Sequence, residues 1–185
     1  MDTDSDTDLD LTTRISRLEA YEDIRRLVAR YGVAVDDRDI DTVGSLFTED
    51  GVFRHGDDSL VNHGRQEIVD FYTDRLTAFG PTYHYPHSHL IDLVGDTEAT
   101  GVVMAHAELG IDGTTMVTAL RYRDRYVIDG GQWRFAERAI AMLYYMDMAE
   151  LAAGGLSQPD RKRYFGTVGP SELPEPLATW QAFFA

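Results

Sequence analysis

Apolar residues recur at helical spacing in two long stretches of the first half of the chain, residues 12–37 and residues 65–79. Charged residues fill the opposite face of each stretch, which is the pattern of an amphipathic helix. A shorter helix is expected at residues 39–47, where Asp39 can cap the first turn, and a brief strand is expected at 52–54. The first half of the chain is therefore predicted to be mainly helical.

Runs of strand character fill most of the chain after residue 81. They are rich in β-branched and aromatic residues, and short Gly-Asp, Asp-Gly and Gly-Gly pairs of hairpin type separate them. The runs are HSHLIDLVGD, TEATGVVMAHAELG, TTMVTALRYRDRYVIDG and GQWRFAERAIAMLYYM. Helices first and a meander second predict an α+β fold in which the helices pack on one face of a curved antiparallel sheet.

Composition divides the chain into three parts. Residues 1–11 form an acidic leader that is expected to be disordered, because it has too little apolar surface to bury. Residues 12–148 are expected to form one domain, since 185 residues provide material for one sizeable core. Residues 149–185 contain four prolines and a Gly-Gly pair, which predicts a wrapping tail or a lid.

The charge and the missing cysteines exclude several classes of function. Without cysteine, thiolate nucleophiles, thiolate zinc sites and iron–sulfur clusters are impossible. The formal net charge of −15 repels nucleic-acid backbones and anionic membranes, so neither is an expected partner. No apolar run is long enough to span a bilayer, and the first residues are acidic, which indicates a cytoplasmic protein. Nucleotide-binding and calcium-loop motifs are missing from the sequence, so no cofactor is expected.

Three histidines, His84, His87 and His89, lie close together in the segment HYPHSH. The period of two places His87 and His89 on one strand face, with His84 out of phase unless Pro86 breaks the strand. Three ligands on one strand suit tetrahedral zinc poorly, so no metal is expected here. Acid–base chemistry by a neutral imidazole paired with a carboxylate is the favoured interpretation, and a structural, hydrogen-bonded histidine is the alternative.

Asp36 is the candidate carboxylate, in the run DDRD at the end of the first predicted helix. Burial in an apolar cavity would raise its pKa and make it a useful base near neutral pH, whereas a solvated helix end is the alternative. Tyr31 lies about 140° from Asp36 around an ideal helix. Both side chains can reach one cavity if the cavity wraps the helix end or if the helix unwinds at Gly32.

The order of elements and several stretches of sequence resemble the nuclear transport factor 2-like superfamily, and in particular its SnoaL-like branch. The similar stretches are LVARYGVAVDDRDIDTVGSLFTEDGVF, HGRQEIVDFY, YHYPHSHLIDLVGDTEATG and GQWRFAER, which cover most of residues 15–140. The resemblance implies a cone-shaped α+β barrel that encloses a pocket. Within the superfamily the chain most resembles scytalone dehydratase, bile-acid 7α-dehydratase and hexachlorocyclohexane dehydrochlorinase, which are cofactor-free lyases.

The resemblance also implies catalytic roles for individual residues. The helix-end carboxylate of these lyases falls on Asp36, the tyrosine before it on Tyr31, and the strand histidine on His84. Their arginine in the last strand falls on Arg138, where it would hold a developing oxyanion. A surface ion pair of Arg138 with Glu137 or with a neighbouring strand is the alternative.

Four further residues are candidate substrate contacts: His106, His89, Tyr72 and Tyr144. His106 matches a polar position of the dehydratases, and His89 is the alternative base if the strand register differs. We expect a dehydratase-like lyase or an isomerase that takes a proton from a hydrophobic cyclic metabolite. A SnoaL-type polyketide cyclase is the alternative enzyme, and a ligand carrier or assembly module is the non-catalytic alternative. An uncovered sheet face predicts a homodimer or homotrimer.

Overall fold

The computed structural model describes residues 9–164 and 166–185. Three helices precede most of the sheet: α1 (Leu11–Asp36), α2 (Ile40–Ser45) and α3 (Gly64–Arg75), the last followed by the 3₁₀ helix η1 (Leu76–Ala78). The main strands are β1 (Phe47–His55), β2 (Val61–His63), β3 (Thr82–Val94), β4 (Glu98–Ile111), β5 (Thr114–Asp129) and β6 (Gln132–Asp147). The C-terminal part contains α4 (Met148–Ala152), η2 (Gly155–Ser157), β7 (Lys162–Tyr164), β8 (Thr167–Gly169) and α5 (Ala178–Phe183).

The helices begin and end close to the predicted positions. Asp10 caps α1 by accepting hydrogen bonds from backbone N–H groups of the first turn, so the helix already includes Leu11. Asp39 caps α2 in the same way, as expected. The predicted disordered leader, residues 1–11, falls outside the described residues at positions 1–8.

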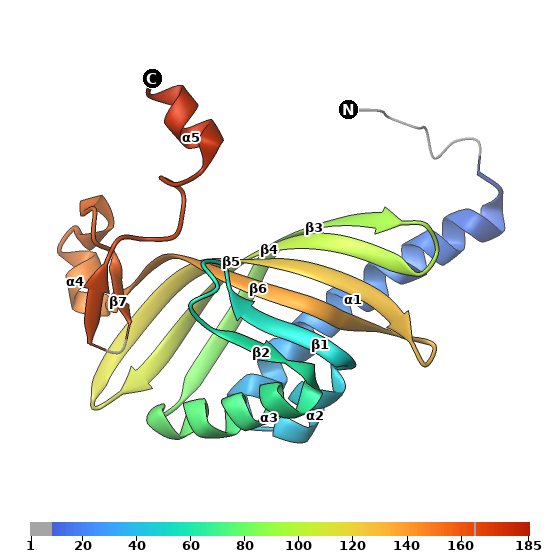
Figure 1. Ribbon diagram of the computed structural model, residues 1–185, viewed down its shortest axis with the longest axis horizontal. Coiled ribbons are helices and arrows are strands. Elements are labelled where there is room, and N and C mark those ends of the chain that lie inside the picture. Colours follow the sequence, from blue (N-terminus) through green and yellow to red (C-terminus); the bar gives the residue numbers. More distant parts are fainter. Residues whose placement is uncertain (1–8, 165) are drawn as a thin grey trace.

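The main strands pair in the order β2-β1-β6-β5-β4-β3, and β7 and β8 extend the sheet beside β6. β3 to β6 form the predicted antiparallel meander (Figure 1). In contrast, β1 runs parallel to β6, so the sheet as a whole is mixed. No hairpin turn joins those two strands, and therefore no local sequence signal fixes the direction of their pairing.

β1 is longer than the predicted strand at residues 52–54. The exposed residues Glu49 and Asp50 interrupt its burial pattern, and its pairing with β6 shifts register between Phe47 and Val52. Such an irregularity hides the start of a strand from a search for alternating residues. β2 pairs with the end of β1, which turns part of the predicted loop into a hairpin.

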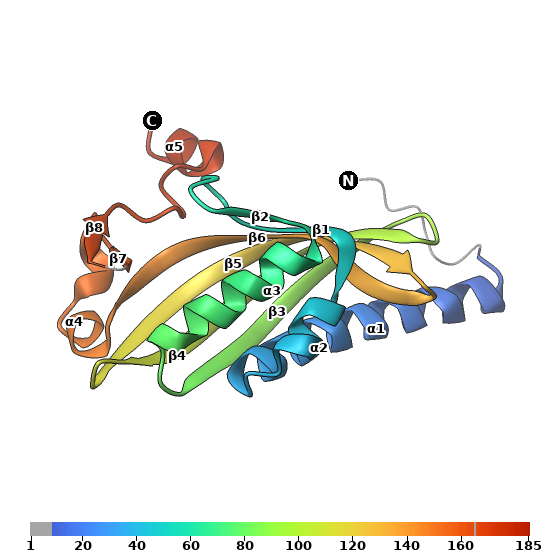
Figure 2. The same ribbon diagram turned by 60° about the horizontal axis from the view of Figure 1, so that its bottom comes forward.

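The helices α1, α2 and α3 cover one face of the curved sheet (Figure 2). The main core fills the space between these helices and the concave face. Its members include Ile24, Leu27, Val28, Tyr31, Phe47, Ile68, Tyr72, Val103, Leu120, Tyr122, Tyr126 and Phe135. A smaller apolar cluster on the opposite, convex face contains Val117, Ala119, Tyr144 and Met146, with Leu143 and Leu151 packed against it. Because successive side chains of a strand point to opposite faces, alternate residues of the same strand belong to two separate cores.

The C-terminal part is attached to one end of the sheet before the chain leaves the body. Arg161 is buried and donates hydrogen bonds to Leu143 O, Ser171 Oγ and Leu173 O, which fastens this part to β6. α5 then stands away from the rest of the chain (Figure 1). Among the helices of the described ranges, none is both long and apolar enough to cross a membrane.

Candidate active site

A cavity of about 100 Å³ lies between the helices and the concave face of the sheet. Most of its lining is apolar or aromatic, including Val35, Phe53, Phe71, Leu76, Phe79, Leu109, Leu120, Ile140 and Met142. Its polar lining includes Tyr31, Tyr72, Tyr122, His55, His84 and Thr82. An apolar pocket with a few placed polar groups is the usual form of a small-molecule site.

His84 and Asp36 form a hydrogen-bonded pair at this cavity. His84 Nδ1 lies 2.7 Å from Asp36 Oδ1, and the backbone N–H of His84 donates to Asp36 Oδ2 at 2.8 Å. Because a carboxylate can only accept, Nδ1 carries a proton, and in the neutral ring Nε2 has a lone pair. Both side chains are 17% exposed, so the pair is largely shielded from water. The structure therefore presents an imidazole base that a carboxylate orients.

The hydrogen bonds around Asp36 favour its charged form. Burial raises the pKa of this carboxyl group, but hydrogen bonds from His84 and Thr82 outweigh burial and bring the pKa below its usual value. The expectation that burial raises the pKa of Asp36 and makes it the base is therefore wrong. A carboxylate that stays charged is instead suited to orient His84 and to stabilise the protonated ring.

Arg38 and Thr82 connect the end of α1 to the start of β3. The Arg38 backbone has a φ of 62°, and its guanidinium donates to Thr82 Oγ1 at 2.8 Å and to the carbonyl oxygen of Gly80. Thr82 Oγ1 donates in turn to Asp36 Oδ1 at 2.8 Å. Neither residue was predicted from the sequence, since Arg38 resembles one more charge at a solvated helix end.

Gly32 explains how Tyr31 and Asp36 serve the same site. α1 continues through Gly32 to Asp36, so the helix does not unwind. A Cβ atom at Gly32 would lie 3.4 Å from His84 Cβ, and the glycine therefore lets β3 pack closely against α1. This close approach brings His84 to Asp36 at the helix end, while Tyr31 enters the cavity from the preceding turn.

Tyr31, Tyr72 and Tyr122 form a tyrosine wall on the inner side of the cavity. The hydroxyl groups of Tyr31 and Tyr72 are hydrogen-bonded to each other. Burial raises the pKa of all three phenols, so they stay protonated at neutral pH. These hydroxyl groups can donate hydrogen bonds to an oxygen atom that gains negative charge.

Arg138 lies behind the tyrosine wall and is not part of the cavity lining. It is fully buried, and its Nε and Nη2 donate to the two carboxylate oxygens of Asp124 at 3.0 and 2.7 Å. Its guanidinium carbon lies 4.3 Å from the ring centre of Tyr31 and 4.0 Å from that of Tyr122. Burial lowers the pKa of Arg138, but Asp124 outweighs burial and keeps the guanidinium charged. Arg138 is therefore paired with the buried carboxylate of Asp124 on the neighbouring strand β5.

A bulge in β3 sorts the three clustered histidines between the two faces of the sheet. The pairing of β3 with β4 shifts register between Pro86 and His89. As a result His84 and His89 lie on the concave side, whereas His87 lies on the convex side. The expectation that His87 and His89 share one face is therefore wrong, because the extra residue breaks the period of two.

His89 belongs to a buried polar chain beside the cavity rather than to the cavity lining. Its Nε2 lies 3.0 Å from the hydroxyl of Tyr126, which donates to Asp124 Oδ2 at 2.7 Å. Burial lowers the pKa of His89 to about 4, so the ring is neutral at pH 7.

His106 and Tyr144 lie on the convex face, away from the cavity. His106 Nδ1 lies 2.8 Å from His87 Nε2, and the ring centres of His106 and Tyr144 are 6.3 Å apart. Of the four predicted substrate contacts, Tyr72 lines the cavity. His55, which the sequence analysis missed, lines it too, because a turn-rich loop after a short predicted strand gave no sign that this side chain is buried.

Residues 16–139, more than half of the chain, match the SnoaL-like domain family. The chain belongs to this family. No curated protein sequence is a significant match. The SnoaL-like assignment agrees with the predicted superfamily and with the order of helices and strands described above.

Solved structures with the same fold include several bacterial proteins. A candidate scytalone dehydratase from Novosphingobium aromaticivorans is 23% identical, with a TM-score of 0.68 over 72% of this chain and 91% of that one. Hexachlorocyclohexane dehydrochlorinase LinA-type3 from Novosphingobium barchaimii is 17% identical, with a TM-score of 0.68 over 74% and 94%. A nuclear transport factor 2-like protein from N. aromaticivorans is 27% identical, with a TM-score of 0.61 over 85% and 99%. The SnoaL-like chain thus shares its fold with proteins of different activities.

Proposed function

We propose that this SnoaL-like protein is a cofactor-independent lyase of dehydratase type. Its substrate is a hydrophobic cyclic molecule with a C–H bond next to a carbonyl group and a hydroxyl group on the next carbon. The observation that carries the proposal is the His84–Asp36 pair, which directs a basic imidazole nitrogen to an apolar cavity. The likeness to proteins described as a dehydratase and a dehydrochlorinase supports an elimination reaction.

In the first step His84 Nε2 takes the proton from carbon, and the C–H electron pair forms an enolate with the adjacent carbonyl group. Asp36 stabilises the protonated ring through the hydrogen bond to Nδ1. In the second step the enolate electrons form the new C=C bond and the C–O bond of the neighbouring carbon breaks. The departing hydroxyl group takes the proton from His84 and leaves as water, so the neutral imidazole is restored.

The tyrosine wall would hold the enolate oxygen between these two steps. The hydrogen bond between Tyr31 and Tyr72 uses one of their two hydroxyl protons, and the other proton is left to donate to the enolate oxygen in a largely apolar site, where a hydrogen bond to developing charge is strong. Arg138 then acts as a positioning residue, since it contacts the faces of the Tyr31 and Tyr122 rings and does not line the cavity. Its positive charge favours negative charge on the Tyr31 hydroxyl and so strengthens that donor.

The test follows proton removal and elimination separately. Proton removal is measured as deuterium uptake by an aryl methyl ketone in heavy water, and elimination as naphthol formation from a benzo-fused cyclic β-hydroxyketone. We expect His84→Ala and Asp36→Asn each to lower both rates by about 10²- to 10⁴-fold. Because the two residues act as one unit, the double variant should be scarcely slower than either single variant.

Asp37→Asn is the matched control, because Asp37 is the exposed neighbour of Asp36 at the end of the same helix. It should keep both rates within about twofold of the wild type. Tight binding of the ketone with no deuterium uptake and no elimination would instead identify a ligand carrier. Equal rates in wild type and His84→Ala would remove His84 as the base.

A further inference from the structure

The cavity has a second histidine, His55, which lies on β1 beyond the far strand of the meander. In the strand order β1-β6-β5-β4-β3, His55 lies on β1 and His84 on β3, so three strands separate them. Both rings line the same cavity, and the walls between them include Leu120 and Ile140. A molecule that fills the cavity therefore meets one imidazole on each side of an apolar middle.

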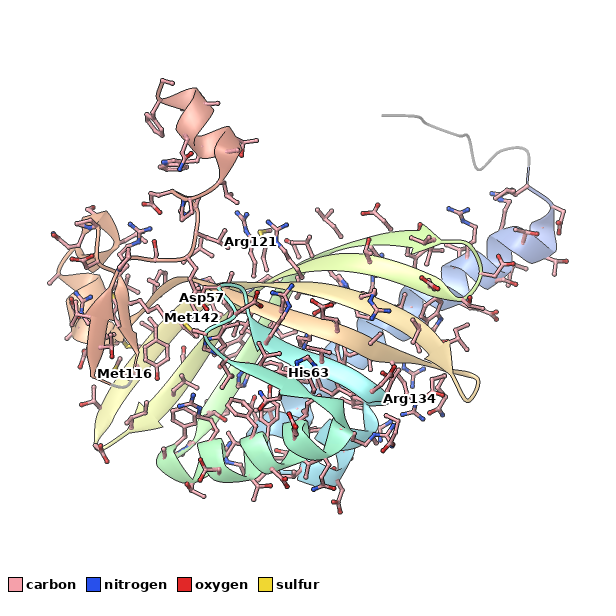
Figure 3. The ribbon with its side chains drawn as sticks, in the orientation of Figure 1. Asp57, His63, Met116, Arg121, Arg134 and Met142 are labelled. Carbon is pink, nitrogen blue, oxygen red and sulfur yellow. The ribbon has the colours of Figure 1, made fainter. Side chains whose placement is uncertain are left out.

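The C-terminal segment supplies the groups behind His55. The backbone N–H of Glu172 donates to Met142 O at 3.0 Å, and the N–H of Met142 donates to Glu172 Oε2 at 2.7 Å. One ring nitrogen of His55 and carboxylate oxygens of Asp57 and Glu172 all lie within 4.8 Å of one another. Figure 3 labels Asp57 and Met142, which both lie at this end of the sheet. Glu172 lies outside residues 16–139, so its carboxylate is an addition to the part that matches the family.

Lys162, the single lysine of the chain, balances the carboxylates behind His55. Its ammonium is paired with Glu172 and lies 4.0 Å from Asp57. This internal cation balances the carboxylate charge that would otherwise attract a metal ion, and we therefore assign the group to the surroundings of the His55 ring.

His55 is neutral at physiological pH. Burial is the largest effect and lowers the pKa of His55. The charged groups packed around the ring act in both directions: Glu172 and Asp57 raise this pKa, and Lys162 and Arg75 lower it. The pKa lies below its usual value as a result. A neutral imidazole both donates and accepts, which suits a hydroxyl group that can do the same.

We propose that His55, with the carboxylate of Glu172 from the C-terminal segment close to its ring, binds a hydroxyl group of the substrate on the side of the cavity opposite His84. This proposal rests on the proposed function in one respect: the substrate group next to His84 is a C–H bond beside a carbonyl group. It defines the substrate class as a compact ring with a ketone on one side and a hydroxyl group, such as a phenol, on the other.

A matched pair of probes tests this hydroxyl site. para-Hydroxyacetophenone carries the ketone and the hydroxyl group, and para-methylacetophenone has a methyl group of similar size in place of the hydroxyl. We expect the wild type to bind the hydroxyl probe about tenfold more tightly, as measured by NMR titration. His55→Phe should abolish the preference, and His55→Gln, which keeps a hydrogen-bonding group, should retain part of it.

Two variants of the C-terminal segment separate positioning from folding. Glu172→Gln should weaken the preference for the hydroxyl probe, because it removes the carboxylate charge that faces the His55 ring. Glu175→Gln is the control, since Glu175 lies in the same segment but pairs with Arg161, and it should keep the preference. An unchanged preference in His55→Phe, or equal affinities of the two probes for the wild type, would overturn the proposal.

The same samples show which of the two proposals fails. A preference that depends on His55, without deuterium uptake by the bound ketone, would reject the lyase and keep the hydroxyl site. Deuterium uptake that depends on His84, with no preference for the hydroxyl probe, would keep the proton chemistry and reject the role of His55.

Discussion

Three hydrogen bonds converge on the Asp36 carboxylate, and all of them come from β3. They are donated by the ring and the backbone N–H of His84 and by Thr82 Oγ1. A hydrogen bond to a charged group contributes about 1.5–3 kcal/mol. Asp36 therefore has two roles at once: it fixes the end of α1 to the first strand of the meander, and it keeps the His84 ring in the tautomer that leaves Nε2 basic.

His89 gives a pH test of the buried polar chain. Its pKa in the folded protein is about 4, whereas an unperturbed histidine titrates near 6.5. The unfolded chain therefore binds a proton at this residue before the folded protein does. The free energy of unfolding should fall as the pH drops from about 6.5 towards 4, and it should not depend on His89 above this window.

The measurement is denaturant unfolding of wild type and His89→Gln across this pH range. The wild type should lose more stability than the variant on acidification, because glutamine has no proton to gain. NMR titration of the His89 ring should show a midpoint well below 6. A midpoint near 6.5, or parallel stability curves for the two proteins, would show that the ring is open to water.

Single residues were predictable from sequence where a local pattern or a resemblance marked them. Asp36 at a helix end and His84 at a strand start are such cases, and the structure pairs them. His55 and Thr82 were not, because their importance comes from contacts with residues far away in the chain. For Arg138 the sequence predicted the strand that carries it. The sequence did not show that its side chain lies behind the tyrosine wall, outside the cavity lining.

Among the elements, β3 does more than add a strand to the sheet. His84, before the bulge, meets α1; after the bulge His89 joins the buried polar chain on the same side, while His87 contacts His106 on the convex face. One extra residue thus puts His87 and His89 on opposite faces, although they lie only two positions apart in the sequence. Local spacing cannot reveal this separation, since a shift of one position moves a side chain to the other face.

The attachment of the C-terminal segment depends on Arg161. Its guanidinium is buried and makes hydrogen bonds to β6 and to the segment that carries Glu172. Arg161→Met leaves several carbonyl and hydroxyl acceptors without a donor, at a cost of about 1–3 kcal/mol for each buried group. We expect the segment after residue 169 to detach while the main domain stays folded.

Limited proteolysis with mass spectrometry checks this expectation. Cleavage between residues 169 and 178 should be much faster in Arg161→Met than in the wild type, and the fragment that contains α1 to β6 should resist digestion. Arg163→Met is the matched control, because Arg163 lies on β7 and pairs with Glu150 outside that segment. Equal cleavage rates in all three proteins would contradict the role of Arg161.

Helices and strands could be predicted where their own sequence carries the signal, but the pairing of strands far apart in the chain could not. The three helices and the four-strand meander have periodic sequences and turn signals of their own, and the structure contains them. The parallel pairing of β1 with β6 and the addition of β7 join segments far apart in sequence. No pattern within either partner specifies such a contact.

For the whole molecule, the two faces of the sheet have different tasks. The concave face holds the cavity and the buried polar chain, whereas most of the convex side of β3 and β4 remains exposed. Large exposed side chains on this side are Tyr83, Tyr85, Leu90 and Met104. Arg121, which pairs across the strands with Met104, points away from the helices in Figure 3. A group of large exposed apolar and aromatic side chains on one face is characteristic of a protein interface.

We propose that a second copy of the chain covers the convex side of β3 and β4, so that the protein is a homodimer or homotrimer. This side of β3 and β4 carries Asp92, Glu98 and Glu108, and the neighbouring strand β5 places Arg121, Arg123 and Arg125 on the same face, so the charges balance there although the chain carries a net charge of −15. Two such faces can therefore meet without strong repulsion, and burial of about 25 cal/mol per Å² of apolar surface favours their association. Analytical ultracentrifugation at micromolar concentration should show a dimer or a trimer.

A charge placed on this face provides the decisive comparison. Leu90 is 69% exposed, so Leu90→Glu does not disturb the core of the monomer, but in an interface it buries a carboxylate without a partner. The variant should sediment as a monomer with the circular dichroism spectrum of the wild type. Val33→Glu, which adds the same charge at a 60% exposed position of α1, should leave the assembly intact. A wild type that stays monomeric, or two variants that behave alike, would assign the convex face to solvent.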